Sequence, residues 1–258
     1  KPQPGPEEVL VNVRSTALNR ADLLQRAGRY AAPPGEPQNI PGLEFAGEVA
    51  ALGTNAHRWH KGDRVMGIVG GGAHAEFVTA HQDALVAVPA NLEWSSAGAV
   101  PEVFITAHDA LRQAGFKAGE NVLVHAVGSG VGLAATQLVK ALGGRAFGTS
   151  RTPDKIERAK TFGLESGFSV SEPSALAELA AFAKDVTGGR GFDVVLDLNG
   201  GPYFAASLEA MALRGRIILI DVSNPTRPSA RSSSRSHDEV GPSTDYADSK
   251  KPICVICG

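Results

Sequence analysis

Two cations and a run of hydroxyls stand where they could bind a phosphate group. Thr149–Thr152 reads Thr-Ser-Arg-Thr, follows the short run Arg145–Gly148, and is followed one helical turn later by Lys155. The hydroxyl of Ser150 and the guanidinium of Arg151 suit a phosphate, because charge-assisted hydrogen bonds to its oxygens are strong. The alternative is an ordinary helix N-terminus, with a threonine as N-cap and a proline at the first helical position.

A glycine-rich turn lies upstream of these residues. Asn121–Ala126 is an apolar run of the kind that a parallel sheet buries on both faces, and Val127–Gly132 follows it. When Gly132 is taken as the third glycine of G-x-G-x-x-G, a valine and a serine hold the first two places. The expected strand before the turn and the expected helix after it favour a dinucleotide-binding turn, whose backbone N–H groups face a pyrophosphate. A tight turn without a ligand is the alternative.

The end of the second strand distinguishes NAD from NADP. NAD sites place an acidic residue about 20 positions past the glycines, whereas NADP sites place an arginine nearby. Here Arg151 and Lys155 occupy this region, and no carboxylate stands at the strand end. The sequence therefore favours NADPH as the cofactor.

The overall composition argues against several classes of function. The chain of 258 residues has a formal net charge of −2, from 25 basic and 27 acidic residues, so nothing indicates a nucleic-acid or membrane partner. No apolar run is long enough to span a bilayer, and no signal peptide is evident. The only two cysteines, Cys254 and Cys257, stand close to the end, which favours a reducing, cytoplasmic location.

The chain separates into three parts by pattern. Residues 1–100, which start without a methionine as a truncated domain would, have the short strands and glycine turns of a β-rich domain. Residues 101–222 alternate strands and helices, as in an open parallel sheet. The expected strands of both parts are 8–13, 47–52, 63–69, 75–79, 85–88, 121–126, 145–149, 167–170, 192–198 and 216–222. The expected helices are 20–27, 131–142, 154–162, 174–186 and 203–212, with a helical region at 94–113.

Two further features follow from this division. Asn199 comes directly after the strand 192–198, and ligands of open α/β sheets bind outside the carboxyl ends of strands, so Asn199 is a candidate cofactor neighbour. A plain glycine turn is the alternative there. Residues 223–258 are rich in serine, arginine and proline, which predicts a disordered tail. The C-x-x-C spacing of Cys254 and Cys257 is more typical of chance than of a redox or metal site.

Several motifs occur in the order of one enzyme family. They are Ala17–Tyr30, Pro41–Gly47, Gly62–Gly67, Gly71–Val78, Pro101–Ala107 and His125–Gly132. On these motifs, over residues 8–222, the chain resembles the zinc-free NADPH quinone oxidoreductases of the medium-chain dehydrogenase/reductase superfamily, the group that includes zeta-crystallin. The resemblance implies an α/β fold with a GroES-like β-rich domain and a Rossmann doubly wound parallel sheet. The C-terminal part of the family fold, including a sixth strand, is not evident after Val222.

The resemblance also implies catalysis without a metal. Zinc-dependent relatives carry metal ligands at the places of Asn19, Leu43 and Glu102, and the first two cannot supply the converging ligands that zinc needs. His57 and His60 have a metal-like spacing but are more typical of a surface turn. We therefore expect no metal site.

The family's activity implies hydride transfer from NADPH to a quinone or enone in a cleft between the two domains. By resemblance, the nicotinamide is bordered by Asn19 and Thr106, the substrate by Tyr30 and Asp22, the pyrophosphate by Ala126, Ser129, Gly130, Val131 and Gly132, and the 2′-phosphate by Ser150, Arg151 and Lys155. One departure is Val170, which stands where the family has a tyrosine that helps to hold the 2′-phosphate. Tyr30 could steady a quinone oxygen or only pack the cleft, and no strong general acid is evident.

Two other functions stay open. The chain could be an enoyl-thioester reductase of the same superfamily, or a crystallin-like protein that binds NADPH without turnover. The expected partner is a small molecule, with no nucleic acid and no membrane, and a complete relative is expected to form a homodimer.

Overall fold

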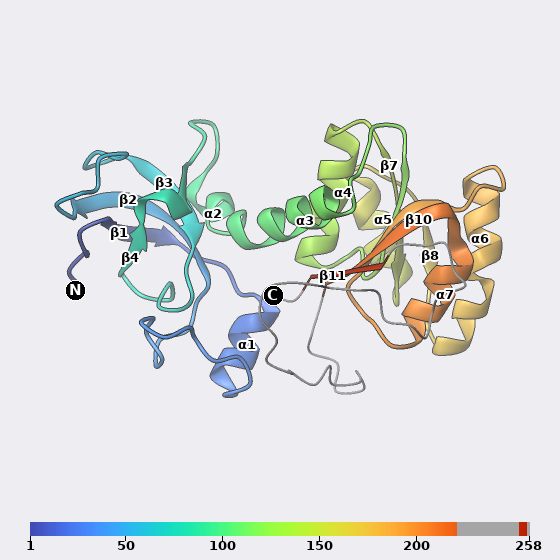
Figure 1. Ribbon diagram of the computed structural model, residues 1–258, viewed down its shortest axis with the longest axis horizontal. Helices are drawn as coiled ribbons and strands as arrows, with labels where there is room; N and C mark the ends of the chain where they lie inside the picture. The colour runs from blue at the N-terminus through green and yellow to red at the C-terminus, as the bar shows by residue number, and fades with distance from the viewer. Residues whose placement is uncertain (221–252, 257–258) are drawn as a thin grey trace, which may run out of the picture. The chain divides into compact units, whose positions relative to one another are not determined.

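The structure, a computed structural model, describes residues 1–220 and 253–256 (Figure 1). It forms two compact units, residues 1–105 and 106–258. The division falls inside helix α3 (Pro101–Gln113), slightly later than the expected boundary at residue 100. The expected α/β class, with one antiparallel and one parallel sheet, is confirmed.

The first unit is built on an antiparallel sheet of five strands in the order β4-β1-β2-β3-β5. Its strands are β1 (Glu8–Ser15), β2 (Glu44–Leu52), β3 (Arg64–Ile68), β4 (Phe77–His81) and β5 (Leu85–Ala87), and its further helices are α1 (Arg20–Arg26), η1 (Gln82–Ala84) and α2 (Trp94–Ala97). The pairing of β1 with β2 shifts register twice, and such irregularities increase the twist of a sheet. The curled sheet encloses a core in which Val9, Val11 and Phe45 are fully buried (Figure 1).

The second unit contains a parallel sheet of six strands in the order β11-β10-β9-β6-β7-β8. The strands are β6 (Asn121–Val124), β7 (Arg145–Ser150), β8 (Leu164–Ser169), β9 (Phe192–Asp197), β10 (Met211–Ile220) and β11 (Ile253–Ile256). The helices are α4 (Gly130–Ala141), α5 (Pro153–Lys160), η2 (Pro173–Glu178), α6 (Leu179–Val186) and α7 (Pro202–Ala210).

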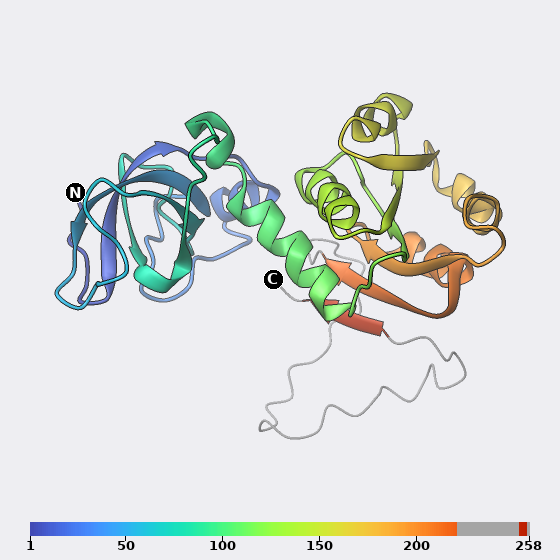
Figure 2. The ribbon, with the colours of Figure 1, turned by 90° about the horizontal axis from the view of Figure 1, so that it is seen from above.

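Helices cover both faces of this parallel sheet. The helices α4 and α5 lie on one face, while α6 and α7 pack together on the other (Figure 2). Because the sheet is sandwiched, strand β6 has Val122, Leu123 and Val124 fully buried, as its continuous apolar run predicts. The order in which strands join the sheet reverses between β6 and β9, because β7 and β8 are added on one side of β6 and β9 and β10 on the other. Open α/β sheets bind ligands at such a switch point.

Several elements differ from the sequence-based expectation. Strand β8 begins at Leu164, earlier than residue 167, and β10 begins at Met211, where the helix 203–212 was expected to continue. The expectation of a tail without structure is wrong for Ile253–Ile256, which pair in parallel with Ile217–Ile220. These four residues are apolar, and three of them are β-branched, which favours a strand despite the polar sequence before them. The rest of the tail lies outside the described residues.

Among the described residues, no helix has both the length and the apolar character needed to cross a membrane.

Candidate functional site

The first turn of α4 offers backbone N–H groups to an anion. Ser129 is the N-cap, and its Oγ accepts a hydrogen bond of 3.1 Å from the N–H of Gly132. Within the described residues, the N–H groups of Gly130 and Val131 have no hydrogen-bond partner. Unpaired N–H groups at the positive end of a helix are the usual binding site for a phosphate.

The turn before α4 needs a residue without a side chain at Gly132. A Cβ atom there would lie 2.7 Å from the carbonyl oxygens of Ala126 and Val127. Ala126 itself has a φ of 49°, a left-handed conformation that is uncommon outside glycine. Sparsely populated backbone angles cluster at ligand-binding sites, so this turn is a candidate for close approach of a ligand to the backbone.

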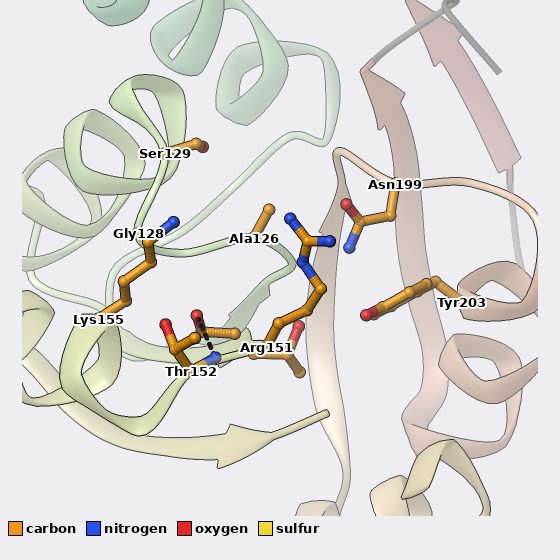
Figure 3. Close-up of a pocket in the computed structure, with 10 residues that line it drawn as sticks. Ala126, Gly128, Ser129, Arg151, Thr152, Lys155, Asn199 and Tyr203 are labelled. Atoms are coloured by element: carbon orange, nitrogen blue, oxygen red, sulfur yellow. Dashed lines mark hydrogen bonds between the residues drawn. The ribbon is translucent and has the colours of Figure 1, made fainter. Parts of the chain in front are cut away.

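A cavity of about 470 Å³ opens beside this turn, within the second unit (Figure 3). It is lined by Ala126, Gly128, Ser129, Thr149, Ser150, Arg151, Thr152, Lys155, Asn199 and Tyr203. These residues come from the turn after β6, from the end of β7 with the start of α5, and from the segment after β9. The cavity therefore lies at the carboxyl ends of three neighbouring strands.

The cavity brings together many of the residues predicted from the sequence. Six of the predicted cofactor residues line it, namely Ala126, Ser129, Ser150, Arg151, Lys155 and Asn199. Gly130, Val131 and Gly132 do not line it but form the adjoining first turn of α4. Thr106 lies on α3, outside the lining, and Asn19, Asp22 and Tyr30 belong to the first unit.

The charge of the cavity is positive. Arg151 and Lys155 form no ion pair within the described part of the chain, whereas four cations of this unit, Arg145, Lys160, Arg190 and Arg216, pair with carboxylates at 2.7 to 2.9 Å. The stem of Lys155 packs on Gly128, where an added Cβ would lie 2.8 Å from the Lys155 Cβ. Figure 3 shows the Arg151 guanidinium between Ala126 and Asn199. Two unpaired cations beside free N–H groups fit a phosphorylated ligand.

Tyr203 lines the cavity, although the sequence analysis did not single it out. It lies in the first turn of α7, and its hydroxyl points toward Arg151 (Figure 3). Val170, which stands at the place of the family's tyrosine, is 3 % exposed and lies outside the lining. The sequence signal for Tyr203 was its position four residues after Asn199, at the carboxyl end of β9.

A buried histidine fixes two walls of the cavity. The ring of His125 is fully buried, with Nδ1 2.8 Å from Thr149 Oγ1 and Nε2 2.8 Å from Ser207 Oγ. The Tyr203 ring meets it edge to face, with centroids 4.9 Å apart. His125 thus connects the end of β6 with β7 and α7. Its contacts with Thr149 and Tyr203 hold these two cavity-lining residues in position.

The neutral state of His125 makes the second unit sensitive to acid. Burial lowers the pKa of His125 from 6.5 to about 4, although the nearby carboxylate of Asp197 favours the charged form. Between pH 6.5 and 4 the unfolded chain binds a proton at this residue while the folded chain does not, so the free energy of unfolding falls as the pH falls. We expect a loss of roughly 3 kcal/mol across this window. Thermal unfolding as a function of pH measures it.

A matched pair of variants assigns that loss. His125→Asn should be less stable at pH 7 but should lack the part of the acid sensitivity that His125 causes. The exposed His57 gives the control, because His57→Asn should keep the wild-type profile. An unchanged pH profile in His125→Asn would contradict the assignment.

The segment after β9 is shaped by Asp197. One carboxylate oxygen accepts hydrogen bonds of 2.9 Å from the N–H groups of Asn199 and Gly200, and the residue is 1 % exposed. This turn fixes the backbone of Asn199 at the cavity wall. The position of Asn199 therefore depends on a buried carboxylate as well as on the glycines that follow it.

A second group of polar residues lies in the first unit. The Asn19 amide donates a hydrogen bond of 2.6 Å to Glu44, and the Asn19 N–H donates one of 2.7 Å to Asp22. The other oxygen of Glu44 accepts the N–H of Glu102 at 2.9 Å. Tyr30 is half-buried and has no hydrogen bond to this group. The structure thus joins the predicted residues Asn19 and Asp22 to two glutamates.

Burial changes the acidity of both glutamates. Burial is the main cause that raises the pKa of Glu44, against hydrogen bonds from Glu102 and Asn19 that lower it. Burial, reinforced by the charges of Glu44 and Asp22, raises the pKa of Glu102 to about 7. No group of three or more His, Cys, Asp or Glu side chains in the described ranges could hold a metal ion.

Comparison with known proteins gives consistent families for both units. Residues 5–90 match the alcohol dehydrogenase GroES-like domain, and residues 130–236 match the zinc-binding dehydrogenase family. A quinone oxidoreductase of Pseudomonas aeruginosa is 36% identical over 228 residues, which are 88% of this chain and 68% of that protein.

Two further similarities are to a mycobacterial synthase and to a solved mycobacterial protein. The phthioceranic/hydroxyphthioceranic acid synthase of Mycobacterium bovis is 35% identical over 218 residues, 84% of this chain and 10% of the synthase. A solved mycobacterial protein in complex with NADPH has a TM-score of 0.78 and 33% identity, covering 88% of this chain and 70% of that one. The match to the Pseudomonas aeruginosa quinone oxidoreductase covers more than two thirds of that protein, and it establishes the family. The chain belongs to the quinone oxidoreductases of the medium-chain dehydrogenase/reductase superfamily, whose members are nicotinamide-dependent oxidoreductases.

Proposed function

We propose that this protein binds NADPH and transfers a hydride from it to a small quinone or enone. The observation that carries the proposal is the pair Arg151 and Lys155, unpaired within the described residues, in a cavity beside the N-terminus of α4. The N-terminus of α4 suits the pyrophosphate of a dinucleotide, and the cations Arg151 and Lys155 suit the 2′-phosphate that distinguishes NADPH from NADH. NADH lacks the 2′-phosphate and would leave both cations without a partner.

We propose one arrangement of the cofactor along the cavity. The pyrophosphate would lie on the N–H groups of the first turn of α4, and the 2′-phosphate between Ser150, Arg151 and Lys155. The adenine would lie between the Arg151 guanidinium and the Tyr203 ring, since both offer a flat face for stacking. When bound, NADPH supplies the hydride, and the protein supplies orientation and a dry site.

The substrate end of the site is proposed from the family. Asn19 and Thr106 would border the nicotinamide, and Tyr30 would border the substrate. Asp22 is 3 % exposed, so it would act from behind Asn19, whose N–H it accepts, and not by touching the substrate. Asn19 has its amide nitrogen fixed by Glu44, so its orientation is set before the cofactor binds. Fixed polar groups raise the rate by holding the reacting atoms in line.

The main alternative substrate is an enoyl thioester. It is favoured by the similarity to the mycobacterial synthase and to the solved CurK enoyl reductase, which is 30% identical with a TM-score of 0.74. A thioester carried on a phosphopantetheine would need a basic surface for its carrier. The first unit exposes Arg20, Arg26 and Arg29 in and near α1, and Arg58 and Lys61 further along the chain, where Arg58 pairs with Asp83, so this surface is only mildly basic.

A comparison of substrates separates these functions. With NADPH in excess, we expect a larger kcat/KM for a simple benzoquinone than for a short enoyl thioester. The reverse order would favour the enoyl-thioester reductase. Tight NADPH binding with no turnover of either substrate, nor of a simple enone, would favour the crystallin-like binding protein.

A further inference from the structure

Three carboxyl groups of the first unit lie close together with few donors to neutralise them. Asp22 comes from α1, Glu44 from the start of β2 and Glu102 from the first turn of α3. Asp22 and Glu44 are 3 % and 0 % exposed, and their charges act on Glu102. Like charges within a shared site cannot all ionise easily, so one member of such a group tends to keep its proton.

The hydrogen bonds favour Glu102 as the carboxyl that keeps a proton. Both oxygens of Glu44 accept hydrogen bonds, at 2.6 Å from Asn19 and 2.9 Å from the Glu102 N–H, which stabilises its ionised form. Asp22 accepts the N–H of Asn19 on one oxygen, and His74 Nε2 lies 4.0 Å from that oxygen. Its other oxygen is buried and has no partner within the described residues. The carboxyl of Glu102 accepts no hydrogen bond from any described residue.

Glu102 also differs from the other two in its access to a ligand. It is partly exposed, whereas Asp22 and Glu44 are buried, so only Glu102 can exchange its proton freely. It lies one helical turn before Thr106 on α3, so both side chains project from the same face of that helix. The N–H of Glu102 donates a hydrogen bond to one oxygen of Glu44, and the amide of Asn19 donates to the other oxygen. Asn19 and Thr106 are the two residues proposed to border the nicotinamide.

We propose that Glu102 is the catalytic acid that protonates the reduced substrate, with Asp22 and Glu44 as the residues that keep it protonated. This inference rests on the proposed hydride transfer to a quinone or enone. The substrate accepts the hydride, with its two electrons, from the cofactor and becomes a hydroquinone anion or an enolate. The O–H bond of Glu102 then breaks, a new O–H or C–H bond forms on the substrate, and Glu102 remains as a carboxylate that water reprotonates.

The acidity of the groups supports this direction of proton transfer. A hydroquinone anion is a phenolate, and phenols such as tyrosine have a pKa of about 10. Glu102, with a pKa raised to about 7 by burial and by the charges of Glu44 and Asp22, is the stronger acid, so the transfer is downhill. At pH 7 about half of the Glu102 carboxyls therefore still carry a proton, whereas an ordinary glutamate is almost fully ionised.

The test uses the full chain with NADPH and a benzoquinone, as a function of pH. Wild-type kcat should fall as the pH rises through about 7, where Glu102 loses its proton. Glu102→Gln keeps the backbone N–H that binds Glu44 but has no proton to give, so its kcat should be roughly 10²-fold lower at pH 6 and independent of pH. The matched control is Glu93→Gln, an exposed glutamate of the same unit, which should behave as the wild type.

A spectroscopic readout tests the proton itself without turnover. The infrared difference between wild type and Glu102→Gln should show a protonated carboxyl at pH 6 that disappears by pH 8.5. Absence of that band at pH 6 would overturn the inference. If Glu102→Gln does not fold, carbon NMR of the glutamate carboxyls in the wild type measures the same ionisation, and a Glu102 that is ionised at pH 6 would overturn the inference in the same way. An active wild type with an unchanged Glu102→Gln profile would overturn this inference alone. A wild type that oxidises no NADPH with any quinone or enone would instead overturn the proposed function.

Discussion

Replacing Arg151 and Lys155 together with alanine is expected to weaken NADPH binding by roughly 2–4 kcal/mol, about 30- to 1,000-fold, because two charge-assisted contacts to the 2′-phosphate are lost. The affinity for NADH should change little, since NADH has no phosphate at that position. Both cations line the cavity and have no carboxylate partner within the described residues, so their removal leaves no buried charge unpaired. Binding of each cofactor by calorimetry gives the two affinities directly.

A second double variant controls for the loss of charge. Arg158 and Lys160 lie on the same helix α5 but outside the cavity, so Arg158→Ala with Lys160→Ala also removes two positive charges. This control should keep the wild-type preference for NADPH. Equal losses of NADPH and NADH affinity in the Arg151 and Lys155 variant would contradict the assignment of the 2′-phosphate site.

The substitution Gly132→Ala is expected to cost at least a hundredfold in NADPH affinity. Its Cβ would lie 2.7 Å from the backbone of Ala126 and Val127, and backbone atoms cannot move aside as a flexible side chain can. The turn must therefore shift, and the N–H groups of α4 would no longer face the pyrophosphate together. Overpacking of this kind also costs roughly 1–3 kcal/mol of stability, which thermal unfolding measures.

A glycine remote from the cavity distinguishes binding from stability. Gly188 has a φ of 64° and no atom within 4 Å of an added Cβ, so Gly188→Ala strains the backbone without a clash. We expect this variant to lose stability and to bind NADPH as the wild type does. Wild-type affinity in Gly132→Ala would show that the turn does not hold the pyrophosphate.

The sequence predicted those features that depend on neighbouring residues. The apolar run of β6, the turn ending at Gly132 and the periodic helix α4 follow each other directly, so local pattern was sufficient to predict them. The absence of a carboxylate after β7 is likewise a local feature, and it placed Arg151 and Lys155 in the candidate site. The cavity contains both residues, together with Ser150.

The features that sequence reasoning missed depend on distant residues. Tyr203 reaches the cavity because α7 follows and packs against β9, and His125 contacts Ser207 on α7, 82 positions away in the chain. The raised pKa of Glu102 arises from burial and from the charges of Glu44 and Asp22, which no sequence motif connects to it, so no general acid was evident beforehand. The strand Ile253–Ile256 was missed because the polar residues before it dominated the composition of the tail.

The most direct test of hydride transfer from NADPH to a quinone is the oxidation of NADPH by a benzoquinone. The reaction is followed in a single turnover, with ordinary NADPH and with NADPH that carries deuterium at C4 of the nicotinamide. We expect rapid oxidation that depends on the quinone, a slower rate with the deuterated cofactor and, in the steady state, a much lower kcat/KM with NADH than with NADPH. Equal kcat/KM values for the two cofactors would contradict the role of Arg151 and Lys155. Tight NADPH binding without any quinone-dependent oxidation would contradict the proposed function itself.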